Sequence, residues 1–145
     1  MFFEGLTSRG STAALTAMMA FTEARHRMIA ENVANAHTVN YRAKQLDVRE
    51  FQRALGEAID RGRESAAARF EIRDTDQVEQ LPGGRLRVTP SIRQPLENLL
   101  FHDGTNLSIE RQMADLADNA LVHELSAVLL KDRFDGLRKA IRGQA

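Results

Sequence analysis

The most regular hydrophobic pattern lies near the C-terminus, where apolar positions recur at alternating spacings of four and three residues. This spacing places the side chains along one face of a helix, as in the seam of a coiled coil. Residues 105–142 are therefore predicted to form a single helix about 50 Å long. The predicted seam positions are Ile109, Met113, Leu116, Ala120, His123, Ala127, Leu130, Phe134, Leu137 and Ile141.

A less regular apolar stripe follows residues 11–36. Ser11 or Thr12 is expected to cap this helix, and Thr22 and His26 interrupt its seam. Because a single long helix cannot bury its own stripe, we expect the two terminal helices to pair as an antiparallel, coiled-coil-like stem. The apolar seam positions of the N-terminal helix are Leu15, Met19, Ile29 and Val33. The apolar residues left to face other chains are Leu121, Leu125, Val128 and Leu129.

Between these ends, residues 44–104 form a variable middle segment with weaker patterns. A short helix is expected from Asp47 to about Ala68, on the apolar positions Val48, Phe51, Leu55 and Ile59. Two alternating segments, 70–73 and 85–88, flank the turn residues 81–84 and predict a small β-hairpin. The predicted fold is thus mainly α, in one domain over 1–145, with an N-terminal helix and turn over 11–43 and an irregular middle.

The end of the N-terminal helix carries an unusual group of amide and small residues. Asn32 and Asn35 lie three positions apart and present two amides on one helix face. The small Ala34 permits a close approach of another backbone. Residues Thr38 to Asn40 read as a turn, and Tyr41 follows as an aromatic anchor. This segment is expected to fix the exit of the helix or to dock against another chain, although an ordinary asparagine-bearing helix C-terminus has the same spacing.

Composition excludes several classes of function. The chain of 145 residues has 20 basic and 20 acidic residues, whereas a sequence-independent nucleic-acid binder has a basic excess; this balance weakens that class but leaves a local basic patch open. The absence of cysteine excludes disulfides, thiol catalysis and cysteine-ligated zinc. No apolar run approaches the roughly 18 residues that span a bilayer. The N-terminus lacks the features of a cleaved signal peptide, so these patterns alone favour the cytoplasm.

Candidate chemistry is equally sparse. The four histidines show no helical pair spacing of the kind that binds a metal; His26 and His123 could meet across paired helices, but two hydrogen-bonded or partly solvated seam histidines are the preferred interpretation. The many carboxylates read as solvated helix faces, and no nucleophile or phosphate-loop motif is found. We therefore expect no enzymatic activity, no metal or other cofactor, and no small-molecule substrate.

The exit segment resembles the N-terminal signature of the flagellar axial proteins, a family of rod and hook subunits. Its one departure is Val39-Asn40, where that family usually has Pro-Gly. Asparagine tolerates a positive φ, so a tight turn is still expected there. The matching positions are Asn32, Val33, Ala34, Asn35, Thr38, Tyr41 and Arg42.

The C-terminal half resembles the same family. Residues 103–113 are similar to the entry into the C-terminal helix of axial proteins, and residues 116–121 continue the similarity. The ending 129–141, together with the short length of the chain, resembles the proximal rod subunits. His123 stands where that group commonly has tyrosine.

This resemblance implies a structural subunit of the bacterial flagellar basal-body rod that polymerises through its terminal helices. It implies export through the flagellar type III apparatus without signal cleavage, and a final place in the periplasm. The implied partners are other rod subunits, copies of the chain itself, the adaptor joining rod to export gate, and the export apparatus. It also implies an export element at Phe2, Phe3 and Leu6. A cytoplasmic helical adaptor or secretion chaperone remains the alternative.

Overall fold

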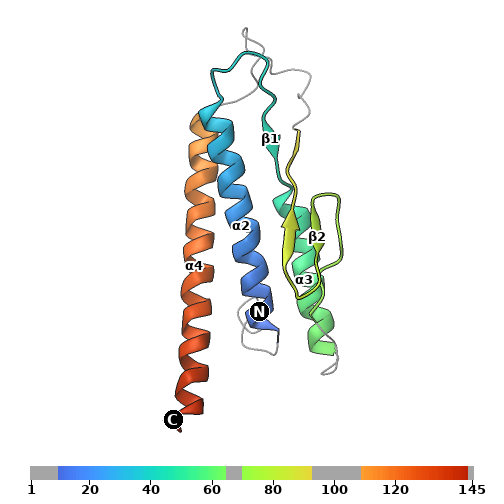
Figure 1. Ribbon diagram of the computed structural model, residues 1–145, viewed down its shortest axis with the longest axis vertical. Coiled ribbons are helices and arrows are strands. Elements are labelled where there is room, and N and C mark those ends of the chain that lie inside the picture. The colour runs from blue at the N-terminus through green and yellow to red at the C-terminus, as the bar shows by residue number, and fades with distance from the viewer. Residues whose placement is uncertain (1–9, 65–69, 93–108, 144–145) are drawn as a thin grey trace.

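The chain is mainly helical in the computed structural model, which describes residues 10–64, 70–92 and 109–143. The helices in these ranges are α2 (Ser11–Ala34), α3 (Val48–Glu64) and α4 (Ile109–Ile141). Figure 1 shows α2 in the middle, with α4 on one side and α3 with the strands on the other. The predicted helical class is confirmed, and α2 is the element that the rest of the described chain surrounds.

The face of α2 that meets α3 is apolar. Phe21 of α2 and Phe51 of α3 stack their rings with centroids 3.9 Å apart. The start of α3 is capped because the Asp47 carboxylate accepts the Glu50 N–H at 2.9 Å. The predicted stripe of α3 is confirmed, since Phe51 and Leu55 are buried in the core and Val48 and Ile59 pack against it. The core residues are Ala14, Ala17, Phe21, Met28, Ile29, Leu46, Phe51, Ala54, Leu55, Ala58, Ile72 and Val78.

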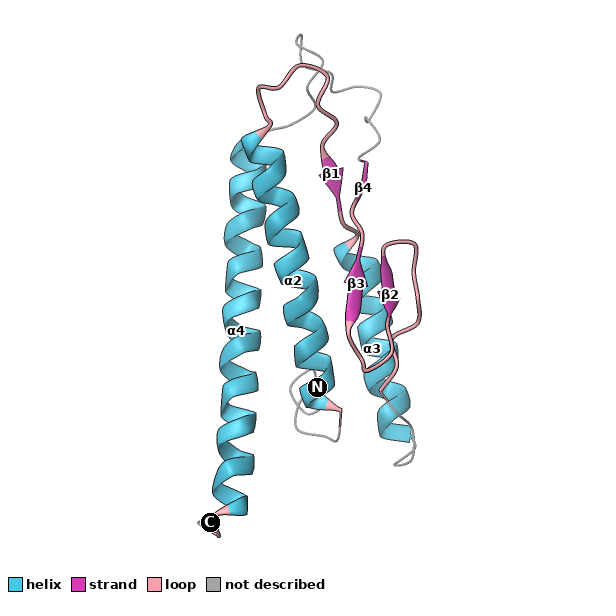
Figure 2. Cartoon of the chain, viewed as in Figure 1, coloured by secondary structure: helices cyan, strands magenta, loops and turns pink. Residues whose placement is uncertain are grey.

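Two small antiparallel sheets lie beside α2, and in the view of Figure 2 one of them lies in front of α3. In the first, β1 (Lys44–Gln45) pairs with β4 (Ser91–Ile92), and in the second, β2 (Val78–Gln80) pairs with β3 (Leu86–Val88). The Gln77 side chain joins the two sheets, since its amide donates to the Gln45 carbonyl and its Oε1 accepts the Asp47 N–H at 2.7 Å. The polar Gln77 therefore helps to hold the two sheets together.

The predicted hairpin exists, but its first strand was placed wrongly. The strand opposite β3 is β2 at residues 78–80, and residues 70–73 form no strand. The turn decides this, because the Leu81 N–H donates to the Arg85 carbonyl at 2.8 Å and only residues next to the turn can continue the ladder. Residues 70–73 instead contact the end of β2 through a side chain, since the Ile72 N–H donates to Gln80 Oε1 at 2.6 Å.

The predicted cap of the N-terminal helix is also wrong. Gly10 occupies the N-cap position at a φ of 138°, and no side chain caps the helix. Ser11 is the first helical residue, and its Oγ is buried with no hydrogen-bond partner. The chain approaches α2 through a conformation that glycine adopts easily, which explains why neither Ser11 nor Thr12 occupies the cap.

Helices α2 and α4 lie side by side in antiparallel directions (Figure 1). Contacts from Asn32 to Gln112, from Arg25 to Asp115 and from Thr22 to His123 run in opposite senses along the two helices. Because α4 has 33 residues and α2 has 24, the C-terminal end of α4 extends beyond α2.

The predicted seam is only partly buried in this pairing. In α2, Leu15 and Ile29 are buried, while Met19 and Val33 are half-buried. In α4, the half-buried members are Ile109, Leu116, His123, Ala127 and Leu130. The exposed members are Met113, Ala120, Phe134, Leu137 and Ile141.

Those exposed residues are not buried against α2, for two reasons. Phe134, Leu137 and Ile141 lie on the overhanging end of α4, where the exposed fraction of Ile141 reaches 86%. Nearer the N-terminus of α4, the buried positions are polar, which places Met113 at 53% exposure. The buried residues of α4 are Gln112, Asn119 and Ser126.

Candidate functional site

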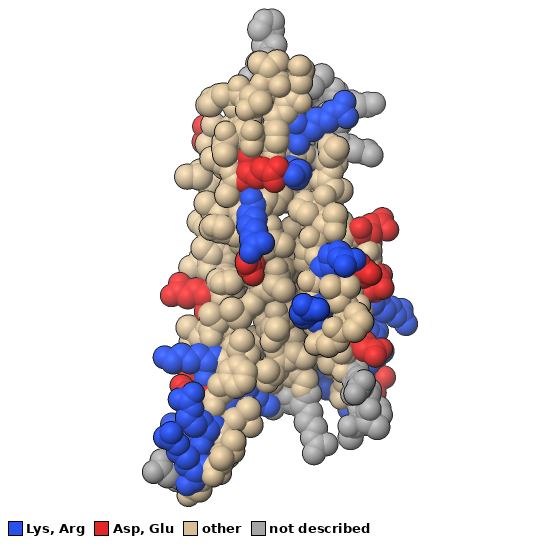
Figure 3. Space-filling view, viewed as in Figure 1, with Lys and Arg blue, Asp and Glu red and all other residues tan. Residues whose placement is uncertain are grey.

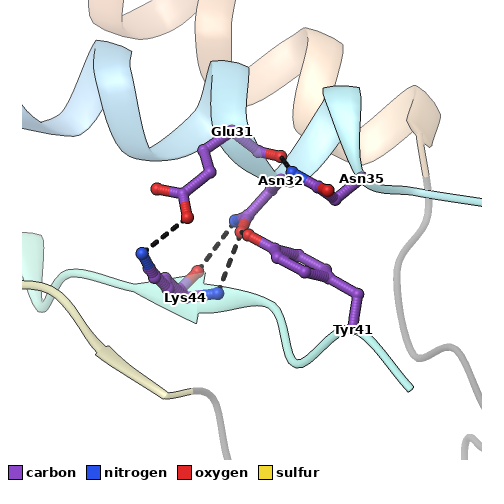
Figure 4. A network of polar contacts seen from close by, with 5 residues as sticks. All are labelled: Glu31, Asn32, Asn35, Tyr41 and Lys44. Atoms are coloured by element: carbon purple, nitrogen blue, oxygen red, sulfur yellow. Dashed lines mark hydrogen bonds and ion pairs between the residues drawn. The ribbon is translucent and has the colours of Figure 1, made fainter. Parts of the chain in front are cut away.

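The side-chain amide of Asn32 forms the centre of a junction at the end of α2 (Figure 4). Its Nδ2 donates to the Lys44 carbonyl at 2.8 Å and to Gln112 Oε1 at 3.2 Å. Its Oδ1 accepts the Lys44 N–H at 2.9 Å and the Tyr41 hydroxyl at 3.0 Å. With 1% exposure, Asn32 therefore satisfies both donors and both lone pairs inside the protein. The side-chain amide of Asn32 bonds to both the N–H and the carbonyl of Lys44, as the backbone of a neighbouring β-strand would.

The other predicted exit residues lie around this amide junction. Asn35 caps the helix end, because its Nδ2 donates to the Glu31 carbonyl at 2.8 Å. Thr38 donates its hydroxyl to Asn35 Oδ1 at 3.4 Å, a long contact. Ala34 is exposed. Among the predicted exit residues, Asn32 makes the central hydrogen bonds.

A tight turn follows α2 although the chain has Val39-Asn40 rather than Pro-Gly at this place. The Tyr41 N–H donates to the Thr38 carbonyl at 3.1 Å, which closes a four-residue turn. Asn40 occupies the third position with a φ of 61°, and Val39 is not among the positive-φ residues. A positive φ at the third position alone defines a type II turn. Asparagine can supply this conformation, as expected from the sequence.

This geometry makes a first prediction. Asn40→Gly should leave the free energy of unfolding unchanged or raise it by a few tenths of a kcal/mol, because glycine adopts positive φ without strain. Asn40→Ala should lower it by about 1 kcal/mol, because a Cβ disfavours the left-handed region. Urea unfolding of both variants checks this. Equal stability of the two variants would contradict the assigned turn.

A tyrosine, a lysine and a glutamate surround the junction (Figure 4). The Lys44 ammonium lies 2.6 Å from Glu31 Oε1. This hydrogen bond raises the pKa of Lys44 above its ordinary value of 10.5. Burial, and after it the negative charge of Glu31, raises the pKa of Tyr41 above 10.0. The neutral phenol is favoured because it can donate to Asn32 Oδ1, whereas a phenolate would face that oxygen without a proton.

We therefore expect an alkaline limit to the stability of the junction. The folded state holds the Tyr41 proton more tightly than the unfolded state, so this stabilisation is complete below pH 10.0 and is lost as the pH rises through the raised pKa. Tyr41 is the only tyrosine and the chain has no tryptophan, so tyrosinate absorbance reports this residue alone. Its midpoint should lie above that of the same chain in denaturant. Coincident midpoints would refute the assigned environment.

The contact between α2 and α4 is rich in polar groups. Asn119 donates from Nδ2 to the Thr22 carbonyl at 2.8 Å, and the Thr22 hydroxyl lies 2.8 Å from His123 Nδ1. Arg25 pairs with Asp115 at 3.2 Å. His26 is exposed, so it does not form a buried pair with His123. Sequence reasoning overlooked Gln112 and Asn119, although polar residues at a seven-residue spacing were the available signal.

Three apolar residues on the side of α4 that points away from the buried Asn119 are exposed. We call Leu121, Leu125 and Val128 the outer face of α4; their exposed fractions run from 49% to 67%. Toward the C-terminal end of this helix, Lys and Arg side chains gather at the lower left of Figure 3, which suits the negative end of the helix dipole. An exposed apolar helix face marks a surface for other protein chains.

Residues Phe2, Phe3 and Leu6 lie outside the described residues. Within the described ranges, no three or more His, Asp or Glu side chains gather where they would hold a metal ion. None of the helices in those ranges combines the length and hydropathy needed to cross a membrane.

An elongated helical subunit with an exposed apolar helix face is typical of proteins that assemble with other chains. No protein-family model matches the sequence. Among curated proteins, the chain is similar to the flagellar basal body rod protein FlgB of Cereibacter sphaeroides, with 29% identity over 124 residues that cover 84% of this chain and 86% of the relative.

Similar matches exist in other bacteria. FlgB of Salmonella typhimurium is 25% identical over 127 residues (82% of this chain, 83% of the relative), and FlgB of Escherichia coli K12 is 24% identical over 119 residues (81% and 83%). The resemblance to the flagellar rod proteins, which was predicted from the two ends, is thereby confirmed. These lengths exceed the two ends, so the similarity includes part of the middle segment.

Proposed function

We propose that this protein is a structural subunit of the bacterial flagellar basal-body rod. The observation that carries the proposal is the similarity to FlgB rod proteins, which covers more than four fifths of this chain and of each relative named above. A match of that extent includes both helical ends as well as their connection. The function is therefore mechanical, and chemistry on a bound substrate plays no part in it.

Within the rod, we assign this subunit to the proximal segment, with its terminal helices forming the polymer core as a coiled-coil-like stem. The support comes from the similarity to FlgB and from the antiparallel contact of α2 with α4. The outer face of α4 is the surface offered to neighbouring subunits. Burying one leucine or valine there contributes about 1.5–3 kcal/mol, so a few such residues supply a substantial part of a contact.

The proposed partners are copies of this chain, other rod subunits, the adaptor that joins rod to export gate, and the export apparatus. The subunit would pass through that apparatus without cleavage and become part of the rod in the periplasm. Phe2, Phe3 and Leu6 are the proposed export element, which rests on the family resemblance. Ile109, Leu116 and Leu130 are the proposed α4 packing residues within the stem.

Fractionation of cells tests the proposal. An epitope-tagged chain that still supports swimming should copurify with detergent-extracted hook–basal bodies and remain with them through washing. A cytoplasmic adaptor or secretion chaperone would instead stay in the soluble fraction. A strain that lacks the export gate is the control, because the subunit should then accumulate inside the cell. Recovery only in the soluble fraction of the complete strain would refute the rod assignment.

A further inference from the structure

The C-terminal end of α4 carries an apolar strip that the described residues leave exposed. Phe134, Leu137 and Ile141 have exposed fractions of 51%, 51% and 86%. At 3.6 residues per turn, each of them lies within about 60° of Asn119 around the helix, and Asn119 bonds to Thr22 of α2. These three residues, which we call the end strip, therefore continue the α2-facing side of α4 beyond the start of α2.

The register of the two helices shows which residues would lie opposite the end strip. Asn32 bonds to Gln112, whereas Thr22, earlier in α2, bonds to Asn119 and lies beside His123. Each step back along α2 thus moves the partner about one step forward along α4, because both helices rise equally per residue. In this register, residues 2–9 lie opposite about residues 134–141.

The sequence before α2 has apolar residues at the matching positions. These residues are Phe2, Phe3 and Leu6, whose spacing of three to four residues suits one face of a helix. The register places Leu6 opposite about Leu137 and Phe2 opposite about Ile141. The apolar group and the end strip therefore match in position as well as in chemistry.

The length and the connection of this segment also fit. The overhang of α4, from about residue 133 to Ile141, is about 13 Å long. The nine residues before Gly10 span about the same length as a helix and more when extended. Gly10 has a φ of 138°, which ends α2 and lets the preceding residues bend toward α4.

A second copy of the chain is a less suitable occupant of the end strip. Residues 131–142 carry five basic and two acidic side chains, so two such helix ends would repel each other. Residues 1–9 carry one glutamate and one arginine, which adds no net side-chain charge. A segment tethered through Gly10 also has an effective concentration of about 1 mM, far above that of a second copy in dilute solution.

We propose that residues 2–9 dock on the end strip and complete the pairing of α2 with α4, with Leu6 against Leu137. The contact lies within one chain, so the inference does not depend on the rod assignment and its test can fail independently of it. One consequence does rest on the proposed function: Phe2, Phe3 and Leu6, the proposed export element, are covered once the chain folds.

Paired cysteines test the docking because the native chain contains no cysteine. Leu6→Cys is combined with Leu137→Cys and, in a matched control, with Lys139→Cys. Lys139 lies at the same level of α4 but points to the opposite side of the helix, about 160° from Leu137. In dilute oxidising solution, we expect the 6–137 disulfide to form within single chains at least about tenfold faster than the 6–139 disulfide.

A single cysteine measures the same contact without a disulfide. Alkylation of Leu137→Cys should be at least about fivefold slower in the otherwise native chain than in a chain that also carries Phe2→Ser, Phe3→Ser and Leu6→Ser. Leu125→Cys on the outer face is the control, and its alkylation rate should be the same in both backgrounds. The α4 positions changed in these variants are exposed, so the helical circular dichroism should stay native.

Three results would overturn the proposal. The first is an equal rate for the 6–137 and 6–139 disulfides. The second is a 6–137 product found only between two chains, which would assign the end strip to a second copy. The third is an alkylation rate of Leu137→Cys that the three serine substitutions leave unchanged, which would show that the N-terminal segment does not cover it.

Discussion

Replacing Asn32 by leucine is expected to lower the free energy of unfolding by about 2–4 kcal/mol. Leucine preserves the approximate volume of the side chain but removes all four hydrogen bonds of the amide. The Lys44 N–H and carbonyl and the Gln112 amide then lose partners in an interior where unsatisfied polar groups cost about 1–3 kcal/mol each. Urea unfolding followed by circular dichroism measures the loss.

The matched control is Asn35→Leu, at the same end of the same helix. Asn35 is half-buried and donates only to the Glu31 carbonyl, so its replacement should cost less than about 1 kcal/mol. Equal losses at the two positions would mean that the junction has no special role. The two asparagines would then be ordinary residues of a helix end.

Introducing charge on the outer face of α4 should abolish assembly while leaving the isolated chain folded. In Leu121→Glu with Leu125→Glu, both changed side chains already lie in water, with exposed fractions of 67% and 51%. Thermal unfolding of the isolated chain should therefore change little. Burial of two leucines in a subunit contact contributes at least about 3 kcal/mol, so incorporation into the rod should fall more than about 100-fold.

Swimming assays and the yield of tagged protein in purified hook–basal bodies measure this effect. Met113→Glu with Ala120→Glu is the control, since it adds the same charge to the same helix at exposed positions about 80–140° around the helix from Leu121 and Leu125. It should retain most of the incorporation. Normal swimming of the leucine variant would show that the outer face is not a subunit contact.

Much of the helical framework was predictable because its signals are local. The spacing of apolar residues along α3 and α4 identified both helices, and the stripe from Val48 to Ile59 packs as expected. Asn40 was expected to adopt a positive φ on the basis of its residue type alone, and it does so. Such features depend on a few neighbouring residues, which the sequence displays directly.

Other features were missed because they depend on contacts between distant residues. β1 and β4 have two residues each, which is too short to show an alternating pattern in the sequence. They are recognised as strands only because the fold places Lys44 opposite Ile92. The first strand of the hairpin was misplaced because its register follows from the turn rather than from alternation. In each case the deciding contact joins segments that the local pattern treats separately.

The amino-acid sequence by itself determined which segments are helical, how the chain turns after α2, and the resemblance to the flagellar rod proteins. Only the tertiary structure decided which side of α4 faces α2 and which partners Asn32 has. Helical periodicity identifies apolar positions without stating whether they meet this chain or another one. The hydrogen bonds of Asn32 and Asn119, which join residues as far as 97 positions apart, show which side of α4 meets this chain.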